Sequence, residues 1–375
     1  MFFMVKSAYI HIPFCKSKCH YCSFISFDKL ELKKDYLKNL EQEINTYYNG
    51  EILNTLYFGG GTPSILEVDD FSKLIAHFNI SKDTEITAEL NPDGHYDKDK
   101  TSQGLTFDYL RRLFDIGINR ISLGAQTFDD NLLKQINRRH DSKQIIQAVE
   151  NAKKSGFKNI SLDFIYGLPN QSAGMFFDDL QKAIKLGVQH ISLYGLSIEE
   201  GCYFYNHRPQ NLPDDDEQAD MYIGAIELLT SNGFEHYEIS NFSLPDYNSK
   251  HNLNYWNNEE YYGFGVAAHG YTNDIRYGNK ETIEDYIQNP IEHKFEKFET
   301  QKDKLEEEIF LGLRKMNGID IQKINNKFNI DFEDKYLDIL KKYEGLNLLK
   351  KTEKGYSLTP NGVLVSNTIL SEFLD

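Results

Sequence analysis

Cysteine is scarce in this sequence, which has four in 375 residues. That number excludes a small secreted domain held together by disulfides, because such domains depend on a dense cysteine framework. Long hydrophobic runs are also missing: no stretch reaches the ~18 apolar residues of a membrane span, and the apolar start is too short for a signal peptide. We therefore expect a cytoplasmic protein without a membrane span.

Basic residues are in the minority. Lys and Arg number 41 against 57 Asp and Glu, which gives a formal net charge of −16. A surface of that sign repels phosphate backbones and anionic lipids, so we expect no nucleic-acid partner and at most peripheral contact with membrane-bound proteins. The hydrophobic fraction of 40% and the charged fraction of 26% are typical of a globular protein. The length suffices for two or three domains of ~100–200 residues.

Six short runs rich in apolar and β-branched residues alternate with amphipathic stretches. The runs lie at residues 8–12, 55–58, 85–88, 120–123, 160–164 and 190–194, and helical patterns occupy, among others, 30–44, 107–114, 142–154 and 177–186. This alternation predicts a parallel α/β sheet, either doubly wound or a barrel. Glu89, Gln126 and Asp163 fall at or just past the C-terminal ends of predicted strands, where barrel enzymes carry their chemistry. We therefore predict a partial (β/α)6 TIM-like barrel.

The remainder of the chain divides into two parts. A further strand at residues 236–239 completes the barrel domain, which we place at residues 1–240. Residues 241–298 are rich in Asn, Tyr and Gly without a helical period, and they are predicted to form a bridging segment. Helical patterns at 304–315 and 332–343, followed by short strands at 348–350 and 355–358, predict a small winged-helix-like domain over residues 299–375.

Three of the cysteines, Cys15, Cys19 and Cys22, form a C-x3-C-x2-C motif on the loop after the first predicted strand. Thiolates are the usual ligands of iron–sulfur clusters, and three ligands for four irons leave one iron open to a small chelating ligand. Two alternatives are a structural zinc site completed by His20 or a distant residue, and three unrelated buried thiols. A c-type haem motif is excluded, because Ser23 and not His follows Cys22.

The run YIHIPFC at residues 9–15, with its cysteine motif, resembles the radical S-adenosylmethionine (SAM) superfamily. Matching motifs span nearly the whole chain: FGGGTP at 58–63, ELNP at 89–92, INRISLGAQ at 118–126, DFIYGLP at 163–169 and HNLNYW at 251–256. They are most similar to the branch that contains oxygen-independent coproporphyrinogen III oxidases and the HemW haem chaperones. The resemblance implies a barrel of the radical SAM type that binds a [4Fe-4S] cluster through Cys15, Cys19 and Cys22, with SAM at the open iron.

The same resemblance implies a set of SAM-binding residues near the ends of the strands. These are Tyr9, Tyr21, Gly60, Gly61, Thr62, Glu89, Gln126, Arg138, Asp163 and Ser197. Glycines let the backbone approach the methionyl amine, Glu89 and Arg138 suit the charged methionyl end, and Asp163 suits the ribose hydroxyls. Tyr9 and Tyr21 would flank the sulfur centre, and Ser197 would lie near the adenine. Taken singly, a strand-end carboxylate could instead cap the next helix.

The motif H-N-x-x-Y-W supplies the candidate haem ligand, His251, with Cys202 and His269 as rivals. Tyr255 and Trp256 could pack against a flat macrocycle. In the structural alternative, His251 satisfies a turn while the two aromatic residues hold the loop against the barrel. A further match, G-x-G-x-x-A at residues 263–268, is interpreted as a tight backbone and not as a dinucleotide site, because no helix is predicted after it.

Two functions of this branch share the cluster and the SAM site. Its dehydrogenases carry a further cysteine where this chain has Phe24, and a longer segment ahead of the cluster. Both departures favour a haem chaperone that binds haem, the cluster and SAM and transfers haem to an acceptor protein. Ser23 replaces the Asp usual in the HemW family, which leaves the role of that acid open. The alternatives are oxidative decarboxylation of coproporphyrinogen III and a radical SAM reaction on another substrate.

Overall fold

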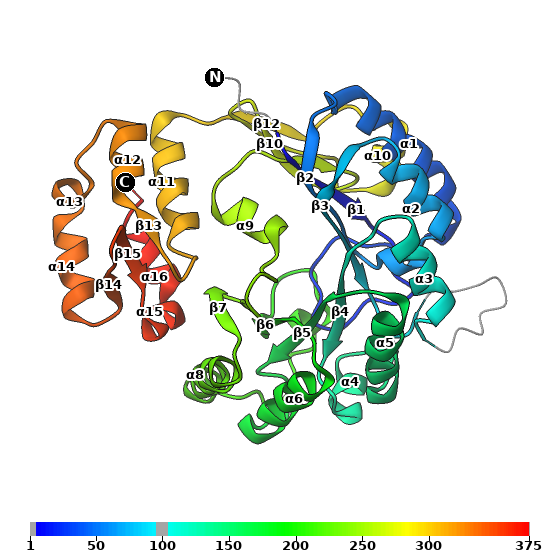
Figure 1. The fold of residues 1–375 in the computed structure, drawn as a ribbon, viewed down its shortest axis with the longest axis horizontal. Helices are drawn as coiled ribbons and strands as arrows, with labels where there is room; N and C mark the ends of the chain where they lie inside the picture. Colours follow the sequence, from blue (N-terminus) through cyan, green and yellow to red (C-terminus); the bar gives the residue numbers. More distant parts are fainter. Residues whose placement is uncertain (1–4, 95–103, 375) are drawn as a thin grey trace.

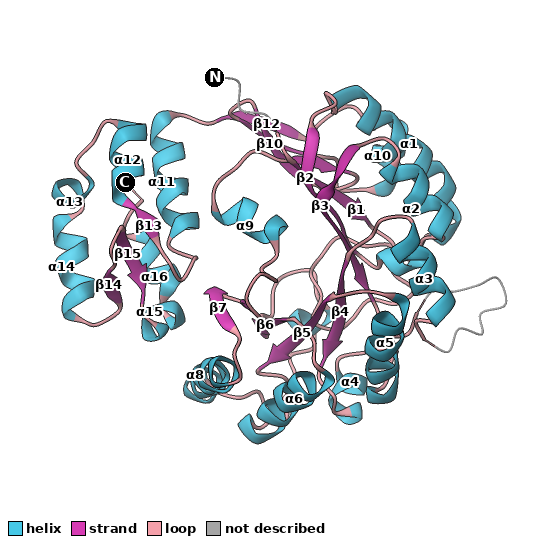
Figure 2. Ribbon diagram, viewed as in Figure 1, coloured by secondary structure: helices cyan, strands magenta, loops and turns pink. Residues whose placement is uncertain are grey.

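The computed structural model describes residues 5–94 and 104–374. Its largest part is a curved sheet whose strands run in the order β7-β8-β6-β5-β4-β3-β2-β1-β9 (Figures 1 and 2). The strands are β1 (Ser7–Ile12), β2 (Ile52–Gly60), β3 (Asn79–Leu90), β4 (Arg120–Gln126), β5 (Asn159–Tyr166), β6 (His190–Gly195), β7 (Glu235–Glu238), β8 (Asn241–Ser243) and β9 (Tyr262–Phe264).

Strands β1–β6 are parallel and adjacent in chain order. A doubly wound sheet reverses its strand order at a switch point, so this sequential order excludes that alternative and confirms the partial (β/α)6 barrel. The helices that surround the sheet include α1 (Lys33–Tyr47), α2 (Val68–Ile75), α3 (Phe107–Asp115), α4 (Asp130–Gln135), α5 (Ser142–Ser155), α6 (Ala173–Leu186), α7 (Tyr203–Asn206) and α8 (Asp215–Ser231). Short 3-10 turns, η1 (Leu30–Leu32) and η2 (Pro63–Ile65), precede α1 and α2.

Capping residues set the ends of the longer helices. Helix α5 begins after Asp141, whose carboxylate accepts the Gln144 backbone N–H, and it stops at Gly156 with a φ of 108°. Helix α6 begins after Ser172 and stops at Gly187 with a φ of 62°. Glycine adopts this left-handed conformation without a Cβ clash, which ends a helix at low cost. Both helices therefore end close to the ends of the predicted helical patterns, 142–154 and 177–186.

The segment predicted to bridge the domains contains a helix, which corrects the expectation of irregular structure. Helix α9 (Lys250–Trp256) carries the H-N-x-x-Y-W motif, and Ser249 caps it by accepting the Asn252 backbone N–H. Its seven residues make two turns, too few to reveal a 3.6-residue period in the sequence. The segment also holds α10 (Ile283–Gln288) and an antiparallel sheet of β10 (His269–Thr272), β11 (Ile275–Gly278) and β12 (Phe295–Phe298).

Strands β8 and β9 lie beyond residue 240 yet join the barrel sheet, β8 between β6 and β7 and β9 at the edge next to β1. Gly263 and Gly265 of the G-x-G-x-x-A match lie in β9 and the turn after it, and β10 follows without a helix. Gly265 has a φ of 100°, and a Cβ there would lie 2.3 Å from the Tyr36 hydroxyl. The glycines therefore serve a close-packed turn, as predicted.

The C-terminal part forms a second core, centred on Ile309, Phe332 and Phe373. Its elements are α11 (Gln301–Gly312), β13 (Ile319–Asp320), α12 (Ile321–Phe328), α13 (Phe332–Lys335), α14 (Leu337–Gly345), β14 (Leu349–Lys351), β15 (Gly355–Leu358), α15 (Pro360–Leu364) and α16 (Ser366–Ser371). The three short strands make an antiparallel sheet in the order β13-β15-β14. Helices packed on a small antiparallel sheet match the predicted helical domain with a β-wing.

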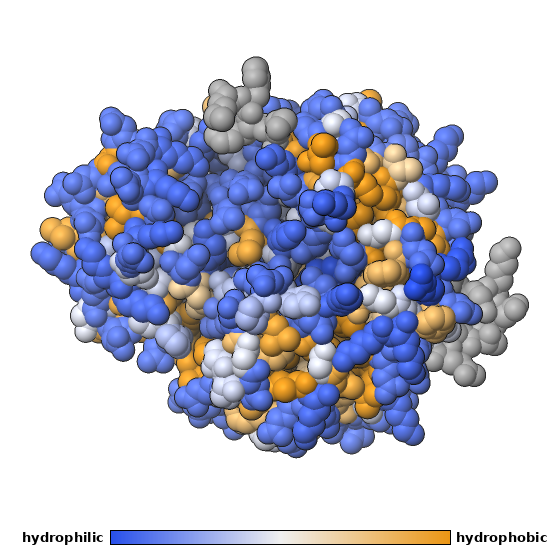
Figure 3. All heavy atoms as spheres, viewed as in Figure 1, coloured by the Kyte–Doolittle hydropathy of each residue, from blue (hydrophilic) through white to orange (hydrophobic). Residues whose placement is uncertain are grey.

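Hydrophilic side chains cover most of the face seen in Figure 3, and hydrophobic ones gather mainly over the barrel half. Within residues 5–94 and 104–374, no helix combines the length and the apolarity needed to cross a bilayer.

Candidate functional site

A cavity of about 570 Å3 lies at the C-terminal ends of the parallel strands. All three motif cysteines line it, together with every predicted SAM residue except Tyr9: Tyr21, Gly60, Gly61, Thr62, Glu89, Gln126, Arg138, Asp163 and Ser197. Tyr9 lies behind the wall, with its hydroxyl 2.9 Å from His11 Nδ1 and its ring stacked on Tyr57. The fold thus brings residues from six strand ends into one site.

The cysteine loop is tied to the barrel on both sides. Cys15 donates its backbone N–H to the Phe27 carbonyl, and the His20 N–H reaches the Ile136 carbonyl. The Cys15 thiol lies 3.4 Å from Thr62 Oγ1. Burial raises the pKa of Cys15 and raises that of Cys22 to about 11. Both groups therefore hold their protons at neutral pH until a cation balances the thiolate charge.

The thiols face one cavity without converging on a single point. In the part of the chain that the structure describes, no three His, Cys, Asp or Glu side chains form a group that could hold one metal ion. A zinc ion needs ligands that converge, whereas a polynuclear cluster binds each thiolate at a different iron. His20 is turned away, since Nδ1 lies 2.9 Å from the Gln135 carbonyl and the ring stacks on Tyr203. The arrangement therefore offers His20 no place as the fourth zinc ligand.

Arg138 is a buried cation between the cysteine loop and the cavity. Its Nη2 donates to Asn91 Oδ1 at 2.8 Å and to the Gly124 carbonyl at 2.6 Å, and Nη1 lies 3.5 Å from Cys19 Sγ. Its Nε has no hydrogen-bond partner among the described residues. The nearby phenol of Tyr21 and thiol of Cys19 raise the pKa of Arg138 despite its burial. A fixed positive charge here suits an anionic group in the cavity.

Glu89 and Asp163 are two half-buried acids of the cavity wall. Glu89 accepts hydrogen bonds from the Tyr57 hydroxyl at 2.7 Å and from the Gly60 N–H at 3.2 Å. Burial, with the charge of Asp163 adding to it, raises the pKa of Glu89 to about 7. Asp163 accepts from Ser122 and Ser161, and burial raises its pKa as well. Each carboxylate keeps further acceptor capacity for a ligand.

Backbone geometry completes the wall. Gly60 has a φ of 109°, and a Cβ there would lie 2.5 Å from the His11 ring. A Cβ on Gly61 would meet the Phe14 carbonyl at 2.8 Å, so a bare backbone edge faces the cavity. Gln126 ends β4 with a φ of 67°, at a register shift in its pairing with β5. Such a conformation is strained for a residue with a side chain, and strain of this kind is typical of functional sites.

Some expectations need correction, and some wall residues were missed. Asp163 lies in the middle of β5 and not at its end. Asn91 was quoted only as part of a motif, but it links Thr62 Oγ1, at 3.1 Å, to the Arg138 guanidinium. Tyr57 was not singled out, because a strand tyrosine carries no sign in the sequence of the carboxylate that its hydroxyl contacts.

The candidate haem ligands lie apart from one another. His251 is 1% exposed, with Nδ1 2.8 Å from Thr55 Oγ1 and Nε2 2.9 Å from the Tyr255 hydroxyl. Cys202 is buried, and exposed His269 contacts the Phe295 ring. His251 does not line the cavity, and one of its ring nitrogens would have to give up its contact to bind iron. Its assignment as a haem ligand stays a prediction that this geometry does not favour.

Trp256 is likewise occupied, because the Arg314 guanidinium lies over its ring at 5.6 Å. The observed contacts therefore agree better with the structural alternative for the H-N-x-x-Y-W motif, except that the motif forms a helix and not a turn. The two aromatic residues and His251 all pack within the protein.

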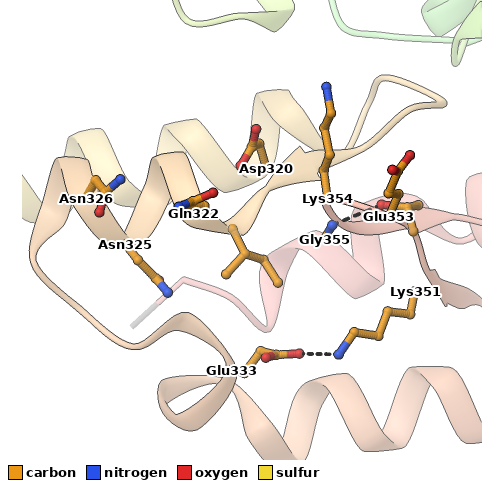
Figure 4. A pocket seen from close by; sticks show the side chains of 11 residues that line it. Asp320, Gln322, Asn325, Asn326, Glu333, Lys351, Glu353, Lys354 and Gly355 are labelled. Carbon is orange, nitrogen blue, oxygen red and sulfur yellow. Dashed lines mark hydrogen bonds and ion pairs between the residues drawn. The ribbon is translucent and has the colours of Figure 1, made fainter.

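A second cavity, of about 520 Å3, lies in the C-terminal domain between α12 and the β14–β15 turn. Figure 4 shows that its wall is polar and that Lys351 is directed toward Glu333, to which it donates at 2.7 Å. Because these opposite charges already pair with each other, this cavity offers less to a charged ligand than the barrel site does.

Comparison with known proteins supports the same class. The Radical SAM superfamily model matches residues 9–183, and the HemN C-terminal domain model matches residues 300–365. A solved structure of coproporphyrinogen III oxidase (HemN) from Escherichia coli superimposes with a TM-score of 0.84, over 99% of this chain and 90% of that one. At 24% sequence identity, this likeness shows the fold alone. Fold and site together are those of a radical SAM protein.

Curated relatives narrow the class to a family. The heme chaperone HemW of Lactococcus lactis subsp. lactis is 38% identical, over 98% of this chain and 97% of that protein. The heme chaperone HemW of Bacillus subtilis is 37% identical, over 99% of both chains. That of Escherichia coli is 38% identical over 70% of this chain and 69% of its own. The chain belongs to the HemW family of the radical SAM superfamily.

Proposed function

We propose that this chain is a haem chaperone that binds haem, carries a [4Fe-4S] cluster with SAM, and passes haem to an acceptor protein. The observation that carries the proposal is the end-to-end match to proteins named heme chaperone HemW, at 37–38% identity over 97–99% of both partners. A match over the whole length includes the barrel, the helix with the H-N-x-x-Y-W motif and the C-terminal domain.

The cysteine loop fits an iron–sulfur cluster. Cys15, Cys19 and Cys22 face one cavity from a tethered loop, and the Arg138 guanidinium lies beside Cys19. Positive charge from bound iron would supply what the buried thiols need to lose their protons. We assign the cluster to these three cysteines.

The rest of the cavity fits SAM. Its volume of about 570 Å3 falls within the ~300–1,000 Å3 typical of small-molecule sites. Glu89 and the bare edge at Gly60 would bind the methionyl ammonium, Arg138 the methionyl carboxylate, and Asp163 the ribose hydroxyls. The bound cluster would supply an open iron and an electron to SAM. We assign no catalytic residue.

One side chain distinguishes the proposal from a coproporphyrinogen dehydrogenase. Phe24 is 69% exposed and lines the cavity at the position where dehydrogenases of this branch have a further cysteine. A phenyl ring cannot ligate a metal or react as a thiol, so this chain lacks that group.

The test uses protein whose cluster has been reconstituted anaerobically. It is incubated with SAM, a strong reductant and coproporphyrinogen III, and protoporphyrinogen and 5′-deoxyadenosine are quantified together. In parallel, haem is titrated by its Soret band, and its transfer to apomyoglobin is followed as a general acceptor assay. We expect stoichiometric haem binding, transfer to the apoprotein and no porphyrin product. Substrate-dependent formation of both products would replace the chaperone with the dehydrogenase.

Matched cysteine variants check the cluster itself. Cys19→Ser should lose bound iron and sulfide, whereas Cys202→Ser, which changes the cysteine outside the motif, should retain them. Equal cluster content in the two variants would contradict the ligand assignment.

A further inference from the structure

Helix α9 packs against the barrel at the opposite end from the cysteine loop. Glu85 of β3 accepts the backbone N–H groups of Lys250 and His251, both at 3.2 Å. Thr55 of β2 contacts the His251 ring. On the same strands, the cavity wall is built four to five residues later, at Gly60 and Glu89. At about 3.3 Å per strand residue, the strand positions that contact α9 lie ~13–17 Å along the strands from those that build the wall.

A chain of buried and half-buried rings connects the two ends. The His251 ring stacks on Tyr57, with centroids 4.8 Å apart and planes 21° from parallel. The Tyr57 hydroxyl donates to Glu89 at 2.7 Å, and Glu89 in turn accepts the Gly60 N–H. Tyr9 also stacks on Tyr57, at 6.1 Å. The rings are too closely packed for one to shift without moving its neighbour.

A branch of this chain reaches the cysteine loop. The Tyr9 hydroxyl lies 2.9 Å from His11 Nδ1, and His11 Nε2 lies 3.0 Å from the Ile25 carbonyl, three residues after Cys22. Burial lowers the pKa of His11 to about 4 and that of His251 to about 3, so both rings stay neutral at physiological pH. The chain therefore acts through packing and hydrogen bonds and not through a changing charge.

We propose that His251 is a positioning residue of the SAM site: held by Thr55 and Tyr255, its ring supports Tyr57, whose hydroxyl aims the Glu89 carboxylate into the cavity. The inference rests on the proposed function only in taking the ligand of that cavity to be SAM. It gives the H-N-x-x-Y-W motif a role at a distance from the ligand, in place of direct contact with haem.

Three variants test the inference in the reconstituted protein. His251→Ala removes the support beneath Tyr57, and we expect the Kd for SAM to rise about tenfold. His251→Phe keeps a ring of similar size, and the Kd should stay within about twofold of wild type. Tyr57→Phe removes the hydroxyl and should weaken SAM binding about as much as His251→Ala. Because both act through Glu89, the double variant should be little weaker than either single one.

A second readout does not depend on any ligand. The Gly60 amide should exchange its hydrogen faster in His251→Ala than in wild type, because its acceptor is no longer held, and it should be unchanged in His251→Phe. His77→Ala, a histidine on the outside of the barrel beside Asn45 and Glu41, is the matched control for both readouts.

The outcomes separate this inference from the proposed function. Wild-type SAM affinity and wild-type Gly60 exchange in His251→Ala would overturn the inference, as would independent, additive effects in the double variant. Loss of haem binding in His251→Ala with unchanged SAM affinity would overturn it in favour of an axial ligand. If wild type itself failed to bind SAM, the proposed function would fail, and Gly60 exchange would still decide whether His251 positions the wall.

Discussion

At the scale of single residues, Glu89 is the acid whose ionisation is most open to measurement. It is half-buried, it accepts two hydrogen bonds from the protein, and its pKa is raised to about 7. Near neutral pH it is therefore divided between its two forms. The ionised form attracts an ammonium group, and the protonated form does not.

SAM binding should follow that ionisation. The affinity is expected to rise between pH 6 and pH 8 and then level off, because the carboxylate is the form that pairs with the methionyl amine. Glu89→Gln should bind SAM about tenfold more weakly at pH 8 and show little pH dependence, since a charge-assisted hydrogen bond contributes ~1.5–3 kcal/mol. Equilibrium SAM-binding measurements between pH 6 and pH 8 test the pH dependence of the wild type and the weaker binding of Glu89→Gln. An unchanged pH profile in the variant would assign the dependence to another group.

Gly60 has a conformation that another residue could not adopt without strain. Its φ is 109°, and the His11 ring lies 2.5 Å from the position that a Cβ would take, so Gly60→Ala changes the cavity wall itself. We expect SAM affinity to fall at least tenfold and the melting temperature to drop. Gly174→Ala, inside α6 with only Ser172 Oγ near at 3.9 Å, should leave binding unchanged and stabilise the protein slightly. Similar losses in both variants would contradict a local effect.

Residue types could be predicted, but their partners could not. The cysteine motif and the strand-end residues were visible in the sequence, because their spacing and types carry the pattern. His251 was interpreted as a haem ligand because it stands beside Tyr255 and Trp256 in a short motif. Only the fold shows that Thr55, 196 residues away in the chain, contacts one nitrogen of that ring.

At the scale of elements, a buried carboxyl joins helix α1 to the segment after the barrel. Glu43 accepts hydrogen bonds from the Gly265 N–H at 2.8 Å, from Asn279 Nδ2 at 2.6 Å and from the Tyr286 hydroxyl. Burial raises its pKa to about 7. One side chain thus holds α1, the β9–β10 turn and α10 together.

Removal of the Glu43 carboxyl should lower the stability of the protein. Glu43→Ala leaves three buried donors without their acceptor, and we expect the free energy of unfolding to fall by about 3 kcal/mol. Glu43→Gln should lose less stability. Because the pKa of Glu43 is about 7, its protonated and ionised forms differ little in free energy at neutral pH, and Gln resembles the protonated form. The raised pKa also means that wild-type stability falls as the pH rises from about 4.5 to 7, and the Gln variant should lack this contribution. Urea unfolding at several pH values checks each statement.

Long periodic elements were predicted well, and short ones were not. Strands β1–β6 and helices α5 and α6 repeat their pattern often enough for the sequence to show it. Helix α9 has two turns and strand β9 has three residues, so neither has room for a period. Their conformation is set by distant contacts, such as Glu85 with the start of α9 and β1 beside β9.

At the scale of the whole molecule, the C-terminal domain is joined to the rest of the chain by backbone hydrogen bonds, by a cation–π contact and by the ion pairs Arg276–Glu307 and Lys304–Asp274. The Ile239 N–H donates to the Arg314 carbonyl at 3.0 Å, and the Met316 N–H donates to the Tyr237 carbonyl at 3.1 Å. The Arg314 guanidinium also lies over the Trp256 ring. The sequence predicted both domains but not this junction.

Trp256→Ala should loosen that junction. We expect it to lower the free energy of unfolding by about 2 kcal/mol, from lost packing and a lost cation–π contact, and to speed limited proteolysis near residues 289–300. SAM affinity should not change, since Trp256 lies outside the ring chain that reaches Glu89. Phe310→Leu, which alters the other ring beneath Arg314 but keeps an apolar side chain, is a milder companion. A protease-resistant Trp256→Ala would show that the backbone hydrogen bonds and ion pairs hold the domains together without the indole.

The placement of this junction has a consequence for how small ligands reach the cavity. The C-terminal domain meets the barrel through Tyr237, Ile239 and Trp256, near α9, while the cysteine loop and exposed Phe24 lie at the other end. No described residue of the C-terminal domain lines the cavity, so a small ligand could enter or leave it without separation of the two domains.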